Sequence, residues 1–572
     1  MRPDTWSIVP ATTSPLMTAS GDRRVDAAIT RTLRYLEGRR RANGTWAGDL
    51  SSSALATAIA TVALRRHAPI RLAMRLRAGT EWLAATQGQD GGWGDAVTDD
   101  STVNATALAV AALHLEQPQR YQEQIARGRR WIDEAGGFAA INDPEQATLS
   151  GPCRTVWAMA ELVPWRAIRS LPVEISLLPK PIRRTISTTF PAFLSLAMLH
   201  DRHRPVARLR RPLRRLVERR GLRWLQRAQC ANGGYEESAF LTSIVAMCLI
   251  ETPGSAIAQR AAAYVEQAQR ADGSWPIDRE LETFDSALTV QALATHGNAL
   301  IGPADAALHR WFQDTQFRAV CFPTGAQPGG WAWAQPGGWP DMDDSSAAIR
   351  ALLRLGERSD QASIQNGLRF MRWMQNRDGS WSTFVKNSRM PFDRACPYIT
   401  GHALAAFAEA GVPSSDPAVA RAITFLERAQ RSDGSFEAIW FRNSVAGTAS
   451  VLEALALLGQ GDGLTARRAA NWLAVSQRPD GGWGGDGAKP SSAEETAWAM
   501  HALLLRDRTF NTGAARRAVD WLLDKQRDDG AWDPSVIGLY YSTLWYSDSM
   551  YAVALPLQAL AAYQRSAAGL RE

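Results

Sequence analysis

Cysteine is scarce in this chain of 572 residues and follows no pairing pattern. The five cysteines are Cys153, Cys230, Cys248, Cys321 and Cys396. They form no CxxC pair and have no histidine or aspartate beside them in a recognisable ligand pattern, which a zinc site or a disulfide framework would require. We therefore expect free thiols in a reducing, cytoplasmic compartment and no metal or other cofactor.

Long apolar runs are also missing. The longest uncharged apolar stretches, 51–64 and 188–199, are shorter than the ~20 residues that a membrane-spanning helix needs. Residues 1–20 lack the apolar core of a signal peptide. We expect no spanning segment, whereas a protein that lies on a membrane surface is compatible with the sequence.

Acidic residues are outnumbered, with 57 Asp and Glu against 64 Lys and Arg. The basic excess is concentrated in residues 201–227, where seven arginines lie between positions 208 and 220. Such a stripe is typical of a solvated helix face, of a surface that binds anionic lipid, or of a nucleic-acid site. No module that reads nucleic acid accompanies it, so we expect no nucleic-acid partner and keep the first two interpretations.

Tryptophan, in contrast, is abundant, with 22 residues beside 10 tyrosines. Many tryptophans end a repeated phrase, Asp/Asn-Gly-x-aromatic. Strong copies are 43–46, 90–93, 272–275, 378–381, 433–436, 480–483 and 529–532, and weaker copies end at Phe138, Tyr235 and Trp331. The aromatic residues of adjacent copies lie about 40 to 56 residues apart, a period typical of helical repeat arrays and barrels.

Each repeat predicts a helix, a tight glycine turn and a second helix. In 472–477 and 521–526 an apolar-periodic segment that carries Trp ends in Gln before the turn, and 494–504 has a helical pattern after it. Strand patterning is negligible. We therefore expect an all-α protein in which at least half of the tryptophans hold helices together rather than contact a ligand.

Three carboxylates stand within four residues at Asp341-Met342-Asp343-Asp344. They precede the apolar-periodic segment 347–355, so they are predicted to lie at a helix N-terminus, where aspartates commonly cap the helix. Three neighbouring carboxylates cannot all ionise cheaply. One of them could therefore hold a proton and act as a strong general acid.

A second group of aromatic residues is not explained by the repeat. It comprises Trp333, Trp339, Trp440, Trp545, Phe284, Phe384, Tyr540 and Tyr551. In a helical barrel such residues could line a central cavity and offer their π faces to a cation.

The repeated Gln-x-x-Asp-Gly-Ser/Gly-Trp phrase resembles the QW repeats of squalene-hopene cyclases and oxidosqualene cyclases, and 341–344 resembles their DxDD acid motif. The similarity extends from about residue 31 to residue 563. It implies two α-α barrel domains, one inserted in the other: an inserted domain of residues 22–271 and a catalytic domain of 1–21 plus 272–572. It also implies a proton-initiated (class II) cyclase of a linear polyprenyl substrate that docks on a membrane, and leaves open whether the chain forms a homodimer.

The resemblance assigns roles residue by residue. Asp343 would be the proton donor, with Asp341 and Asp344 as its flanking carboxylates, and His402 would be the histidine that hydrogen-bonds the donor. Protonation of an isolated alkene requires an acid that is neutral yet strong, a dry cavity and π faces along the path of the cation. The residues expected to stabilise the cation are Phe284, Trp333, Phe384, Trp440, Tyr540 and Tyr551.

Two departures from the family pattern concern the acid's partners and the substrate. Tyr398 stands where hopene cyclases have an aspartate four residues before the histidine, and Asp548 replaces a cavity tyrosine. We expect Asp548 at the cavity wall, where it could suit a polar substrate head.

Three functions stay open on the sequence. The first is a squalene-like triterpene cyclase. The second is a class II cyclase of a shorter substrate, a diterpenyl diphosphate or a prenylated aromatic (meroterpenoid), and a diphosphate would demand Lys, Arg or Mg²⁺ near the cavity mouth. The remote third is a non-catalytic helical-repeat binding protein, which a solvent-exposed Asp343 would favour.

Overall fold

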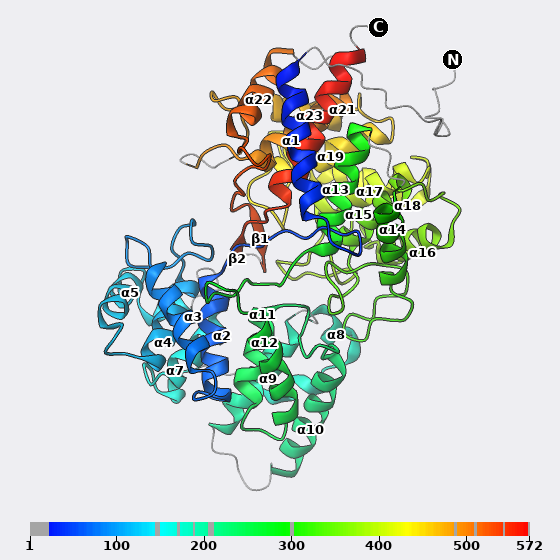
Figure 1. The fold of residues 1–572 in the computed structure, drawn as a ribbon. Coiled ribbons are helices and arrows are strands. Elements are labelled where there is room, and N and C mark those ends of the chain that lie inside the picture. The colour runs from blue at the N-terminus through cyan, green and yellow to red at the C-terminus, as the bar shows by residue number, and fades with distance from the viewer. Residues whose placement is uncertain are drawn as a thin grey trace.

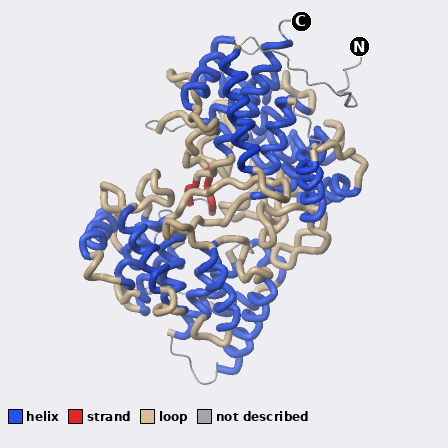
Figure 2. The backbone as a smooth tube through the Cα atoms, in the orientation of Figure 1, coloured by secondary structure: helices blue, strands red, loops and turns tan. Residues whose placement is uncertain are grey.

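The chain forms two helical bodies that meet at loops and a short hairpin (Figures 1 and 2). The computed structural model describes residues 22–142, 149–168, 172–186, 189–203, 211–297, 302–484, 489–507, 512–541 and 544–569. Helices α1 and α13 to α23 form the upper body in Figure 1, and α2 to α12 form the lower one.

The upper body is a barrel of two concentric helix layers. Six inner helices contact each other in a closed ring: α13 (Glu282–His296), α15 (Met342–Arg354), α17 (Pro397–Glu409), α19 (Val445–Leu457), α21 (Ala493–Arg506) and α23 (Tyr551–Gly569). Six outer helices pack against this ring: α14 (Pro303–Thr315), α16 (Ala362–Met374), α18 (Pro417–Ala429), α20 (Leu464–Val475), α22 (Thr512–Lys525) and α1 (Arg23–Arg39). Inner helices such as α19 are buried on nearly every side, whereas outer helices such as α18 bury one apolar stripe.

The lower body is a second, smaller barrel. Its inner ring is α2 (Ala54–His67), α4 (Val103–Glu116), α7 (Ser150–Met159), α9 (Phe190–Arg202) and α11 (Ala239–Leu249). Outside them lie α3 (Ala73–Ala85), α5 (Gln122–Glu134), α6 (Phe138–Asn142), α10 (Arg211–Ala228) and α12 (Ser255–Gln267), and the connecting segments hold η1 (Trp165–Ala167), η2 (Val173–Leu177) and α8 (Lys180–Thr185). The expected all-α fold of two α-α barrels is confirmed.

Helix α1 packs on the upper barrel, although the sequence led us to expect it in the inserted domain of residues 22–271. It contacts α22 and α23, and its buried side chains Val25, Ala28 and Ile29 join the upper core. The side-chain amide of Gln526, at the end of α22, donates to the backbone carbonyl of Ala28 at 3.0 Å. We propose that the catalytic domain includes α1, which closes its outer ring.

The repeat phrase is a turn that ties three helices together. In the copy at 477–483 the amide of Gln477 donates to the carbonyls of Gly481 and of Ala514 on the next outer helix, at 2.9 and 2.8 Å. The indole N–H of Trp483 donates back to the carbonyl of Leu473 at 2.7 Å. Gly481 has φ +94°, and a Cβ there would lie 2.7 Å from the carbonyl oxygen of Arg517. The tryptophan and the glycine are therefore structural, as the repeat predicted.

A two-stranded antiparallel hairpin, β1 (Gly538–Tyr540) and β2 (Leu544–Tyr546), lies where the two barrels meet (Figure 2). Leu539 pairs with Trp545, so Tyr540 and Tyr546 project from the same face. Across the described ranges, none of the helices is both long and apolar enough to cross a membrane.

Candidate active site

The aspartate triplet opens α15, as the sequence predicted. The turn that ends at Trp331 leads out of α14, and the backbone N–H of Asp341 donates to the Trp331 carbonyl at 3.0 Å. Oδ1 of Asp341 accepts the backbone N–H of Asp344 at 2.9 Å and so caps the helix. The capping interpretation is thus correct for Asp341, and it leaves Asp343 in the first turn of α15.

Burial dominates the electrostatics of the two flanking carboxyls. It raises the pKa of Asp341 well above its usual range, and for Asp344 the charges of Asp341 and Asp343 add to the effect. Among the described residues, Oδ2 of Asp341 and Oδ1 of Asp344 are buried without a hydrogen-bond partner. The triplet therefore favours retention of a proton at neutral pH.

His402 on α17 contacts the central carboxyl of the triplet. Its Nδ1 lies 2.6 Å from Oδ1 of Asp343, and both side chains are only about one-seventh exposed, at 13% and 14%. Tyr398 lies one turn earlier on α17, with its ring centroid 4.3 Å from that of His402. The Tyr398 hydroxyl is buried and has no hydrogen-bond partner in the described part of the chain. It therefore does not replace the missing aspartate as a polar partner of the histidine.

A cavity with aromatic walls begins at the triplet. All six aromatic residues expected to face a cation line it: Phe284, Trp333, Phe384, Trp440, Tyr540 and Tyr551. Their rings make successive edge-on or tilted contacts, from Trp333 to Phe384 (5.6 Å between centroids), to Trp440 (5.7 Å) and to Tyr540 (6.0 Å). The indole N–H of Trp440 donates to Thr383 Oγ1 at 2.7 Å, which fixes that ring. The walls thus present a continuous set of π faces beside Asp341, Asp343 and Asp344.

The lining also contains residues that were not foreseen, among them two aromatic residues and an aspartate. Phe441 and Tyr546 line the walls, and so does Asp278, whose carboxyl has its pKa raised to about 7 by burial. Side chains alternate between the two faces of a strand, and Tyr540 and Tyr546 lie on the same face of the hairpin. This alternation could have indicated Tyr546. No local pattern marked Asp278.

Three expectations of a cavity position do not hold in the structure. Asp548 lies outside the cavity lining and accepts the backbone N–H groups of Met550 and Tyr551, at 2.6 and 3.3 Å, at the start of α23. Its position two to three residues before free helix N–H groups is that of a cap. Trp545 instead lies against Arg442, whose guanidinium carbon is 4.0 Å from the ring centroid, and Trp339 is buried elsewhere in the upper core.

A carboxyl triplet at the head of an aromatic cavity defines a site for an apolar substrate that becomes a cation. Two family models match the chain: "Squalene-hopene cyclase C-terminal domain" over residues 282–565 and "Squalene-hopene cyclase N-terminal domain" over residues 29–193. The chain therefore belongs to the squalene-hopene cyclase family of class II terpene cyclases.

Individual relatives agree with the family. The squalene–hopene cyclase of Bradyrhizobium diazoefficiens is 31% identical over 258 residues, which cover 39% of each chain. The probable squalene–hopene cyclase of Sinorhizobium fredii is 26% identical over 592 residues, which cover 85% of this chain and 88% of that protein. The solved structure of ent-copalyl diphosphate synthase from Streptomyces platensis has a TM-score of 0.61 at 21% identity, over 95% of this chain and 100% of that one, which is a likeness of fold.

Proposed function

We propose that the protein cyclises a linear, uncharged polyprene of the squalene type, and that Asp343 starts the reaction by protonating a terminal alkene. The observation that carries this proposal is the 2.6 Å contact between Asp343 and His402 at the head of the aromatic cavity. The Asp343 side chain is only 14% exposed, which argues against a non-catalytic repeat protein, because such a protein would not need a buried acid.

The cavity supports each stage of such a reaction. The proton moves from the Asp343 carboxyl to one alkene carbon, and the other carbon becomes the cation. The flanking carboxyls Asp341 and Asp344 have raised pKa values because they are buried, so the site does not carry three negative charges before the transfer. The aromatic walls then stabilise the cation while they exclude water.

The lining also bears on the class of substrate. It contains Phe, Trp, Tyr and Leu side chains and, among the described residues, no Lys or Arg. A diphosphate group would need such cations or a metal beside it. The lining therefore favours an uncharged chain over a diterpenyl diphosphate, and Asp278 gives a polar point at which a prenylated aromatic could bind.

Exposed apolar side chains support membrane docking. Leu177, Ile182 and Leu216 are 42%, 51% and 56% exposed, on η2, α8 and α10. Segment η2 packs on α10, which carries the described part of the basic stripe and leaves Arg215 and Arg219 exposed. Arg208 and Arg210 lie outside the described residues. We propose that this surface binds an anionic bilayer, since apolar and basic side chains together suit one. Co-sedimentation with phosphatidylglycerol vesicles should weaken in Leu216→Glu.

Product analysis tests the proposed reaction. Purified protein is incubated separately with squalene, geranylgeranyl diphosphate and a geranylgeranylated phenol, and the products are identified by mass spectrometry. We expect cyclic isomers or hydrates of squalene, and none from Asp343→Asn. Turnover of the diphosphate alone would overturn the substrate assignment, and undiminished turnover by Asp343→Asn would overturn the acid.

A further inference from the structure

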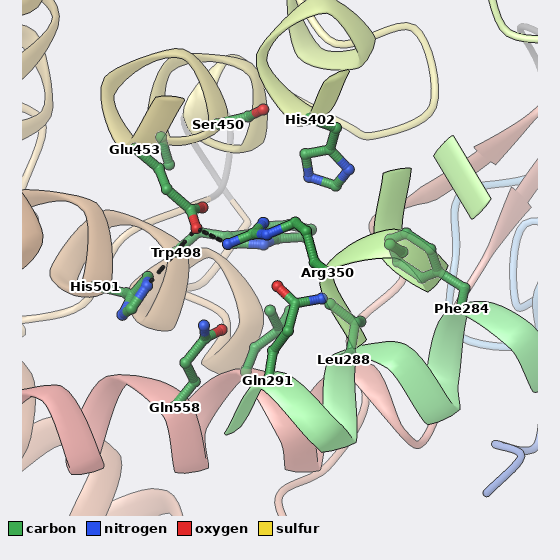
Figure 3. Close-up of a pocket in the computed structure, with 13 residues that line it drawn as sticks. Phe284, Leu288, Gln291, Arg350, His402, Ser450, Glu453, Trp498, His501 and Gln558 are labelled. Carbon is green, nitrogen blue, oxygen red and sulfur yellow. Dashed lines mark hydrogen bonds and ion pairs between the residues drawn. The ribbon is translucent and has the colours of Figure 1, made fainter. Parts of the chain in front are cut away.

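The lumen of the upper barrel continues beyond His402 into a second, polar cavity (Figure 3). We call it the polar chamber. Each of the six inner helices contributes at least one polar residue to it: Gln291, Arg350, His402, Ser450 and Glu453, His501 and Gln558. The chamber has a cavity volume of about 30 Å³, which is room for about two water molecules. Nothing in the reaction described above uses these residues other than His402.

The charged groups of the chamber form a buried cluster. Arg350 is 5% exposed, and its guanidinium donates to Glu409 at 2.8 Å and also to Glu453. Although burial opposes it, the charge of Arg350 lowers the pKa of Glu453 to about 2. Nε2 of His501 lies 4.0 Å from Oε1 of Glu453, and burial lowers the pKa of His501, so this imidazole is neutral at pH 7. A carboxylate and a neutral imidazole thus face a space that can hold water.

The chamber also has a connection toward solvent. Glu409 accepts a second arginine, Arg354, at 2.9 Å, and the Arg354 side chain is 34% exposed. These two residues end α17 and α15, at the opposite end of the inner helices from the aspartate triplet. The cluster therefore extends from the outer end of the barrel to the histidine behind the acid.

His402 lies between the two cavities, because it lines the polar chamber and contacts Asp343, which lines the aromatic cavity. One ring nitrogen, Nδ1, contacts Asp343, while the ring also lines the polar chamber. Its other nitrogen, Nε2, has no hydrogen-bond partner among the described residues, and Figure 3 shows the imidazole in the same space as Arg350 and Glu453. An imidazole can accept a proton at one nitrogen and release a different proton from the other.

The proposed reaction needs such a path. Each cyclisation consumes the Asp343 proton, and the hydrocarbon in the aromatic cavity blocks water on that side. We propose that the polar chamber returns a proton to Asp343 through His402, with Glu453 and His501 holding the water that delivers it. Water gives a proton to Nε2 of His402, Nδ1 gives its proton to the Asp343 carboxylate, and the resulting hydroxide is neutralised from solvent.

This inference rests on the proposed function, and its test compares the first turnover with later ones. The first turnover uses the proton already on Asp343, whereas steady-state turnover requires its return. The variant Glu453→Gln keeps the shape of the side chain and removes its charge, and His501→Asn removes the imidazole without touching the Arg350 ion pairs. Glu116→Gln is the matched control, because it loses a part-buried arginine partner, Arg65, in the other barrel.

With squalene as the probe, we expect the steady-state rate to fall at least fivefold in Glu453→Gln and in His501→Asn. The single-turnover rate, measured with enzyme in excess, should stay within twofold of wild type, and D2O should slow the steady state of the variants more than that of Glu116→Gln. The chamber's role would be overturned if both variants lost the single-turnover rate and the steady-state rate equally. It would also be overturned if neither variant lost any steady-state rate. Activity in Asp343→Asn would instead contradict the proposed function.

Discussion

The contact between His402 and Asp343 gives the sharpest prediction about the chemical step. His402→Leu removes the hydrogen bond at the 2.6 Å contact with the carboxyl and keeps a side chain of similar reach. A hydrogen bond that involves a charged group contributes about 1.5–3 kcal/mol. If that contribution stabilises the carboxylate that forms as the proton leaves, its loss slows the step by about 10- to 150-fold, at 1.36 kcal/mol per factor of ten.

The measurement is the rate of the first turnover, with enzyme in excess over squalene and products quantified by mass spectrometry. His402→Asn is the matched variant, because its side-chain amide can donate from about the position of Nδ1, and it should lose less than tenfold. A His402→Leu variant within twofold of wild type in the first turnover would refute the assignment of His402 as the partner of the acid.

Three further predictions concern stability and specificity. Arg350→Met should lower the free energy of unfolding by about 3 kcal/mol at pH 7, since the pKa of Glu453 is about 2 in the folded protein and 4.5 ordinarily. A carboxyl group whose pKa is lowered by folding stabilises the folded protein above pH 4.5, and this stabilisation is lost as the pH falls toward 2. The difference in melting temperature between variant and wild type should therefore narrow over that range, and a constant difference would contradict the role of this ion pair. Tyr398→Phe removes a buried hydroxyl without a partner, so urea denaturation should show no loss of stability, and a loss above about 2 kcal/mol would be inconsistent with the structure. Asp548→Asn should cost about 1 kcal/mol or less as a weakened cap and leave the product mixture unchanged, whereas a new product would return Asp548 to the cavity wall.

The repeat made the fold predictable because each copy specifies its own local contacts. Even the weak copy that ends at Trp331 has the full geometry: the amide of Gln316 donates to the carbonyls of Gly329 and Ser363, at 2.8 and 2.9 Å. It seemed weak only because an inserted segment separates the glutamine from the tryptophan. Elsewhere Tyr235 replaces the tryptophan, and its hydroxyl donates to the Leu225 carbonyl as an indole N–H would.

The closure of the helix rings by residues far apart in the chain was not predictable from the repeat pattern. Helix α1 joins α22 and α23 across about 500 residues of chain, and no periodicity within α1 indicates which barrel it covers. The same holds for the polar chamber, whose residues each look like one polar position on an apolar helix until six helices bring them together. Local motifs specify turns and caps, whereas ring closure depends on the whole set of helices.

The positions of site residues were predictable where a sequence motif indicated them. They were not predictable where the only indication was a single aligned position. The triplet and the six aromatic residues lie together as expected. Asp548 was placed by its alignment with a cavity tyrosine, but an aspartate just ahead of a helix has free backbone N–H groups within reach, and it binds those.

The most direct test of the central claim is the origin of the added hydrogen. Squalene is cyclised by the wild-type protein in D2O, and the product is examined by mass spectrometry and NMR. Proton-initiated cyclisation predicts one solvent deuterium at the carbon where the reaction starts, and no such product from Asp343→Asn. A cyclic product without deuterium at that carbon would contradict protonation by Asp343 as the initiating step.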